Sequence, residues 1–169
     1  ALAARAALRA GTGLAKLTVP SPVLDSAVAL TPSATARGLP TDGDGRLIAH
    51  EAAEVVDTAA SDADAIVIGP GLGPPHAGAA ALTIRSLAHA ECPVVADADA
   101  LNALAETPDF WLDLRAAAVF TPHPGEFRRL AEPLRLRGDT TDHSERPALA
   151  AAMAQRLGVI IVLKGAHTV

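Results

Sequence analysis

The sequence predicts an α/β fold, arranged as a three-layer α/β/α sandwich around a mostly parallel sheet. Short apolar and β-branched runs recur along the chain and alternate with segments of helical period, a pattern typical of repeated strand–helix units. Half of the 169 residues are hydrophobic, enough to build a sizeable core. The chain contains no internal repeat and no long linker, so residues 1–169 are expected to form a single domain.

The first third of the chain is expected to contain two helices and two strands. Residues 1–10 set arginines inside an apolar pattern, which predicts an amphipathic helix rather than a signal peptide. Ala15–Val19 and Ser26–Thr31 are the expected strands, although neither is strongly β-branched. Ile48–Ala59 has helical spacing, and the preceding segment TARGLPTDGDGR is expected to be a turn-rich surface connection.

The remaining strands are more strongly apolar, and their carboxyl ends should form the functional edge of the sheet. Helices are expected around Leu82–Ala88 and Leu149–Leu157, the second with Ser144 as its N-cap and Gly158 just past its end. The segment PLRLRGDTTDHSER is expected to be a surface connection. The four expected strands are Ala65–Ile68, Pro93–Ala96, Ala117–Phe120 and Val159–Leu163.

Composition excludes several classes of function. The net charge of −5 and the dispersed arginines provide no basic surface for nucleic acid. No apolar run is long enough to span a bilayer, so a cytoplasmic protein without membrane contact is expected. The single cysteine, Cys92, excludes an internal disulfide and is expected to be a buried structural thiol.

Two polar segments follow the central strands. In AIVIGPGLGPPHAG, Gly69, Gly71 and Gly73 precede a helix start near His76, which would allow close approach of an anion, although a simple tight turn is also compatible. The spacing matches neither the Rossmann nor the Walker motif.

The second segment, PVVADADALNAL, carries Asp97, Asp99 and Asn102. The two aspartates are expected to face the same side of an extended chain, unless Asp99 caps the next helix. They suggest an oxygen-rich site for a hydroxylated ligand, or for Mg²⁺ held through water rather than by direct protein ligands.

Two further segments, at the ends of the last two expected strands, contain candidate binding residues. In VFTPHPGEFRRL, prolines on both sides hold His123 in an extended, rigid turn before a helix that starts at Glu126, while Gly125 allows close approach. Lys164 follows the strongest strand, in a chain that has twelve arginines and only two lysines. A compact ammonium there suits a phosphate, although a solvated surface lysine is the alternative.

Five motifs in this order resemble those of ADP-dependent (S)-NAD(P)H-hydrate dehydratases, the YjeF C-terminal domain family. The motifs are ALRAGTGL, IGPGLG, DADALN, TPHPGE and LKGAHT, and the resemblance covers nearly all of the chain. It implies a ribokinase-like fold and repair of hydrated nicotinamide cofactors. ADP, or ATP in some members, would phosphorylate the added hydroxyl so that it leaves as phosphate.

The resemblance also implies roles for individual residues. Asp97 and Asn102 would support the reacting centre. The hydrated cofactor would be bound by Gly71, Gly73, His123 and Glu126. The adenine nucleotide would be bound by Lys164, Gly165, Ala166, His167 and Thr168.

One family motif is absent from the sequence. The glycine-rich GTGD turn, whose aspartate the family uses as catalytic base, has no counterpart here, so the catalytic base is unknown. The chain is therefore expected to be an internal fragment, incomplete at both ends and inactive alone. The whole enzyme is expected to form a homo-oligomer and to be associated or fused with an NAD(P)H-hydrate epimerase domain. A ribokinase-like kinase for a vitamin precursor and a non-catalytic nucleotide-binding module remain alternatives.

Overall fold

The computed structural model describes residues 1–88 and 91–169. The chain divides into two compact units, 1–62 and 63–169, each of which has its own parallel sheet. The expectation of one domain over the whole chain stays a prediction. No helix within the described residues has the length and apolar character that a bilayer crossing demands.

The first unit is built around two parallel strands that pair from Lys16 with Thr35 to Pro20 with Leu39. The amphipathic N-terminal helix is confirmed, and so are the first strand and the helix after residue 48, with shifted ends. In chain order the elements are α1 (Leu2–Arg9), β1 (Lys16–Pro20), η1 (Ser21–Val23), α2 (Leu24–Leu30), β2 (Thr35–Leu39) and α3 (Ala49–Ala60).

Two expectations for this unit are wrong. Ser26–Thr31 is not a strand, because most of it belongs to α2, where only Ala27 is buried. The second strand, β2, lies instead in the segment expected to be a surface connection. A short apolar run has no period that distinguishes helix from strand, so pairing with β1 decides which segment becomes the second strand. Within β2, a Cβ on Gly38 would lie 2.7 Å from the Ser21 hydroxyl, which donates to the Leu39 carbonyl.

The second unit contains a four-stranded sheet in the order β3-β4-β5-β6, with all neighbours parallel. The four strands expected here are confirmed, although Val159–Leu163 is represented by only two strand residues. The strands are β3 (Ile66–Ile68), β4 (Val94–Ala96), β5 (Ala118–Phe120) and β6 (Ile160–Ile161). The helices are α4 (Ala77–Ala88), α5 (Asp99–Ala105), η2 (Phe110–Asp113), α6 (Pro124–Ala131) and α7 (Arg146–Leu157).

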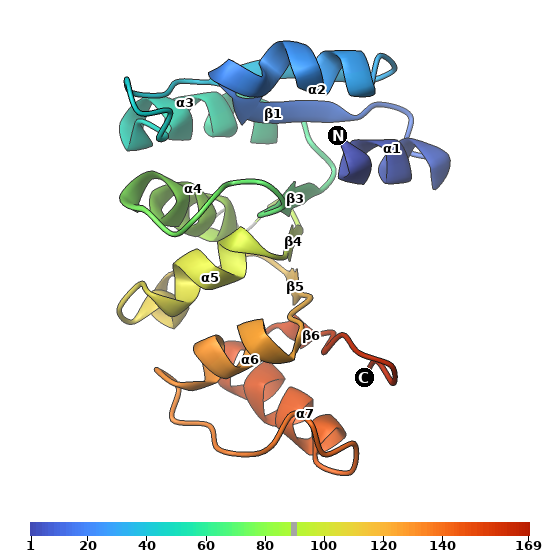
Figure 1. Ribbon diagram of the computed structural model, residues 1–169, viewed down its shortest axis with the longest axis vertical. Coiled ribbons are helices and arrows are strands. Elements are labelled where there is room, and N and C mark those ends of the chain that lie inside the picture. Colours follow the sequence, from blue (N-terminus) through green and yellow to red (C-terminus); the bar gives the residue numbers. More distant parts are fainter. Residues whose placement is uncertain (89–90) are drawn as a thin grey trace. The chain divides into compact units, whose positions relative to one another are not determined.

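The core of this unit lies on one face of its sheet. Ile68, Ala96, Phe120 and Ile161 are buried there, together with apolar side chains of α4 to α7 such as Leu87, Leu101, Leu130 and Met153. Figure 1 shows α4, α5 and α6 stacked beside the column of strands. The side chains on the opposite face of the sheet are more exposed, since Val67 is 56% and Ile160 is 62% exposed. The predicted α/β class with parallel sheets is confirmed.

The ends of α7 show what local sequence does and does not decide. Gly158 terminates the helix at a φ of 68°, as its position predicts. Ser144, however, is not the N-cap, because the cap position is Glu145 and the Ser144 hydroxyl donates to Asp142 Oδ1. A side chain can satisfy a neighbouring turn instead of a helix end.

Candidate active site

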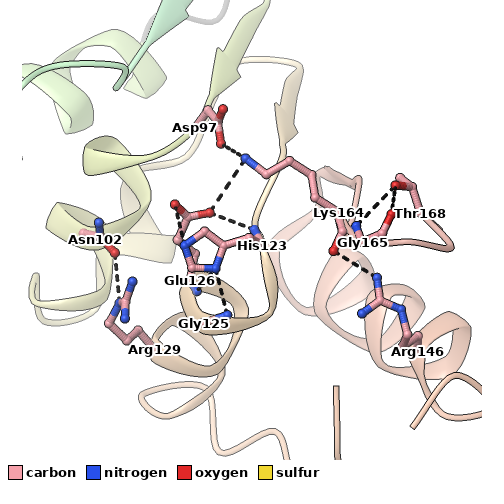
Figure 2. Close-up of polar contacts among 10 residues, drawn as sticks. All are labelled: Asp97, Asn102, His123, Gly125, Glu126, Arg129, Arg146, Lys164, Gly165 and Thr168. Atoms are coloured by element: carbon pink, nitrogen blue, oxygen red, sulfur yellow. Dashed lines mark hydrogen bonds and ion pairs between the residues drawn. The ribbon is translucent and has the colours of Figure 1, made fainter. Parts of the chain in front are cut away.

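Polar side chains from several strand ends of the second unit gather at one edge of its sheet. Asp97 follows β4, His123 follows β5 and Lys164 follows β6, and Figure 2 shows the three side chains around one site. Backbone hydrogen bonds extend the sheet beyond the strands, since the Lys164 N–H donates to the Pro122 carbonyl at 2.8 Å. The structure therefore brings these three candidate residues to the carboxyl edge of the sheet.

The histidine turn is held by an unusual helix cap. His123 is extended, as the flanking prolines predict, and it is the N-cap of α6. Its Nδ1 accepts hydrogen bonds from the backbone N–H groups of Gly125 (2.9 Å) and Glu126 (3.3 Å). In return, Glu126 Oε2 accepts a 2.7 Å hydrogen bond from the His123 N–H, which completes a capping box.

This cap determines how the imidazole of His123 is presented. Because Nδ1 accepts from the backbone, the neutral ring carries its proton on Nε2. That nitrogen lies 3.3 Å from Glu126 Oε1, and half of the histidine side chain is exposed. Gly125 is needed for the close approach of the ring, since a Cβ there would lie 2.7 Å from His123 Cε1. The turn thus offers a pre-oriented N–H donor.

Glu126 itself is almost completely buried, at 5% exposure. Its carboxylate accepts from the His123 backbone and lies 3.9 Å from Lys164 Nζ through Oε2. These contacts turn Glu126 toward the protein, where it joins the histidine turn to the lysine. Its expected contact with the hydrated cofactor stays a prediction.

Lys164 forms an ion pair across the sheet edge with Asp97, at 2.5 Å from Nζ to Oδ1. Burial alone would raise the pKa of Asp97, but hydrogen bonds from Lys164 and Thr121 outweigh it, so the pKa lies below its ordinary value. The Lys164 side chain is 40% exposed, so solvent and ligands can reach part of it. Lys164 is thus a partly exposed lysine that is paired with a carboxylate, and its contact with a phosphate stays a prediction.

The glycine loop after β3 packs directly against the aspartate segment. Gly69 has a φ of 122°, and a Cβ there would lie 1.7 Å from the Asp97 carbonyl oxygen, so only glycine fits. Gly71 and Gly73 also have positive φ but have open space around them. The Gly73 N–H donates to Asp99 Oδ2 at 3.0 Å, which ties the loop to α5.

The two aspartates do not act together as expected. Asp97 contacts Lys164, whereas Asp99 lies in the first turn of α5 and holds Gly73. Between them, Ala98 has a positive φ of 52°, which is rare for a residue other than glycine. Asn102 also departs from the predicted cluster, because its Oδ1 accepts from Arg129 Nε at 2.9 Å.

The turn after β6 contains the predicted nucleotide-binding stretch. Thr168 closes it, since its hydroxyl donates to the Gly165 carbonyl at 3.1 Å and accepts from the Gly165 N–H at 3.3 Å. The His167 ring contacts His143 edge-on, with centroids 4.9 Å apart. Ala166 is exposed.

Sequence reasoning missed Arg146, which is buried beneath this turn. The guanidinium donates to the carbonyls of Leu163 and Lys164. Its only sequence signal is an arginine at the start of a helix, where a cation opposes the helix dipole.

Cys92 lies outside the site. It is buried, as expected, and burial followed by the nearby Asp64 charge raises the pKa of its thiol. A protonated, buried thiol is a poor nucleophile.

Comparison of the sequence with known proteins identifies one family. A family model described as NAD(P)H-hydrate dehydratase, of the Carb_kinase type, matches residues 1–169. The chain is 36% identical over 169 residues to the ADP-dependent (S)-NAD(P)H-hydrate dehydratase of Xanthomonas campestris pv. campestris, covering 99% of this chain and 54% of that protein.

Longer relatives show the same similarity. The bifunctional NAD(P)H-hydrate repair enzymes Nnr of Salinibacter ruber and Escherichia coli are 36% and 39% identical, over 99% and 97% of this chain. The chain spans 30% and 28% of their lengths. With the family model matching along its whole length, the chain belongs to the NAD(P)H-hydrate dehydratase family.

Proposed function

We infer that the full-length protein dehydrates the S-form of hydrated NADH or NADPH back to the reduced cofactor, with ADP or ATP as co-substrate. The observation that carries this proposal is the meeting of two different binding turns at one sheet edge. The histidine turn offers an oriented N–H donor. A 2.8 Å hydrogen bond from the Lys164 N–H to the Pro122 carbonyl joins it to the lysine turn, whose Lys164 side chain is partly exposed. The first suits a hydroxylated organic ligand and the second suits a phosphate.

In this proposal the terminal phosphoryl group of the nucleotide passes to the hydroxyl on the nicotinamide ring. The phosphate then leaves with its C–O bond electrons, and loss of a ring proton restores the double bond. Lys164 would stabilise the negative charge on the transferring group, and Asp97 and Glu126 would hold the ammonium in place until the nucleotide arrives. His123 would orient the hydrated ring through Nε2–H. The residue that removes the proton is not assigned.

The roles of the flanking residues belong to the same proposal. The open space around Gly71 and Gly73 supports approach of the hydrated cofactor, and the turn that Thr168 closes supports nucleotide binding by Gly165, Ala166 and His167. Asn102 would act through Arg129. Mg²⁺ belongs to the same proposal and would be held through water near Asp97, whose Oδ1 already contacts Lys164. No step is assigned to the metal.

The proposal extends to partners and place of action. The bifunctional names of the relatives support a second activity, an NAD(P)H-hydrate epimerase, fused to or associated with this one. A homo-oligomeric, cytoplasmic enzyme is the corresponding expectation, and gel filtration of the full-length protein tests the oligomeric part.

The decisive experiment incubates the full-length protein with hydrated NADH or NADPH and measures the return of reduced-nicotinamide absorbance. ADP or ATP should be required, and adenine nucleotide and phosphate should be released in step with cofactor. Phosphorylation of a vitamin-precursor alcohol without cofactor release would instead establish a kinase. Nucleotide binding without either reaction would establish a binding module.

A further inference from the structure

Arg146 is a buried cation at a place that does not favour one. It is 3% exposed and occupies the first position of α7. The positive end of a helix dipole disfavours a cation there, and a buried charge is costly unless acceptors surround it. Its burial therefore requires compensating contacts.

Those contacts all go to backbone carbonyls of two segments. Nη2 donates to the carbonyls of Leu163 (2.9 Å) and Lys164 (3.0 Å), at the start of the lysine turn, while Nη1 donates to the carbonyl of Thr140 at 2.9 Å. Figure 2 shows the guanidinium beneath Lys164 and Gly165. Because a guanidinium is a rigid planar fork, three such bonds fix the two segments relative to each other. Nε of Arg146 has no hydrogen-bond partner among the described residues.

Gly165 shows how closely the turn packs on this cation. A Cβ on Gly165 would lie 2.7 Å from Nη2 and 3.2 Å from Cζ of Arg146. Gly165 does not have a positive φ, so its backbone conformation does not require glycine. The close approach of the guanidinium is what requires glycine here, so Arg146 and Gly165 pack as one unit.

We propose that Arg146 is a positioning residue for the nucleotide turn. It holds the backbone of Lys164 and Gly165 in the geometry that presents the Lys164 ammonium at the sheet edge. Carbonyl oxygens carry only partial charge, so the guanidinium also leaves a positive potential beneath the turn that attracts phosphate. This inference rests on the proposed function, because it takes 164–168 as the nucleotide contact.

The test compares Arg146→Met and Arg146→Lys with Arg156→Met in the full-length protein. Arg156 is an exposed arginine in the last turn of the same helix, which makes it a matched control. Two quantities are measured: hydrogen exchange of the peptide containing 164–168, and ADP affinity by calorimetry. Arg146→Met should speed exchange in that peptide and raise the Kd for ADP by about tenfold, since charge-assisted hydrogen bonds are lost. Arg146→Lys should restore part of both, and Arg156→Met should change neither.

A second route reaches the same contact if Arg146→Met does not fold. Gly165→Ala alters an exposed turn and should weaken ADP binding by pushing the guanidinium aside. In the Arg146→Lys background, Gly165→Ala should raise the Kd for ADP by a smaller factor than in the wild type, because lysine lacks the planar guanidinium. Additive effects on the Kd for ADP would overturn the proposal.

The remaining outcomes separate positioning from simple structural support. Unchanged exchange at 164–168 in Arg146→Met, or faster exchange with normal ADP affinity, would overturn the positioning role. A lowered Tm with unchanged exchange at 164–168 and unchanged ADP affinity would overturn it as well. If the wild-type protein binds neither ADP nor ATP, the proposed function fails and the nucleotide role of Arg146 fails with it. The exchange data then show separately whether the backbone clamp exists.

Discussion

The histidine turn and the lysine turn meet at one edge of the sheet, but they are held in different ways. His123 is held by its sequence neighbours, through the capping box with Glu126 and the prolines on either side. The lysine turn is closed by Thr168 and is held at its start by Arg146, which lies 18 residues before Lys164. A turn that is held locally can be recognised in the sequence, whereas one held from a distance shows only its exposed residues.

The largest effect is expected at Glu126, the residue that joins the two turns. Glu126→Ala removes a buried acceptor from the His123 N–H and a charge near Lys164. We expect a loss of about 2–3 kcal/mol in the free energy of unfolding, measured by urea denaturation. Glu126→Gln should lower the free energy of unfolding by a smaller amount. Glu132→Ala, on an exposed position of the same segment, is the control. Equal losses at both positions would show that Glu126 does not connect the turns.

Lys164 should produce the next largest effect, on nucleotide affinity. Lys164→Ala is expected to raise the Kd for ADP about ten- to a hundredfold and to reduce its salt dependence, because one charge-assisted contact is lost. Lys164→Arg should recover only part of the ADP affinity, since the planar guanidinium does not replace a compact ammonium. Calorimetry of the full-length protein at two salt concentrations measures both. The chain's other lysine provides the control, Lys16→Ala. An affinity that survives both changes at Lys164 would remove the phosphate role.

His123 separates helix capping from ligand binding. His123→Ala should lower the free energy of unfolding by about 1 kcal/mol through loss of the cap, whereas His123→Asn should retain most of it, since asparagine is a good N-cap. Both variants lose Nε2 and should weaken binding of the hydrated cofactor about tenfold or more, with ADP binding nearly unchanged. Parallel losses for the two ligands would mean that the turn is structural only.

The smallest effect is a pH dependence at Asp97. Its pKa is lower in the folded protein than the ordinary value of about 3.9, so its stabilising contribution is complete above that value and is lost as pH falls through the lowered pKa. The Tm difference between wild type and Asp97→Asn should therefore shrink on acidification. Thermal unfolding from about pH 6 down to about pH 3 tests this linkage. A difference that stays constant would show that Lys164 does not stabilise the carboxylate.

Much of the second unit was predictable from the sequence because its signals are local. Runs such as Ala117–Phe120 combine β-branched and apolar residues with turn residues at their ends, and a parallel order then places those ends along one edge. The rigid histidine turn followed from Pro122 and Pro124, which restrict their neighbours without help from the rest of the fold. The choice of His123 and Lys164 as candidate site residues came from the same local signals and from the resemblance.

Tertiary structure decided what depends on partners that are distant in the sequence. Thr35–Leu39 became a strand by pairing with β1, and Ser26–Thr31 did not, since a short apolar run alone favours neither state. Lys164 pairs with Asp97 across 67 residues, while Asp99 faces Gly73 instead. Arg146 carries no motif at all. Its role comes from burial beneath the turn and from the three carbonyls that it meets there, and such contacts exist only after the chain has folded.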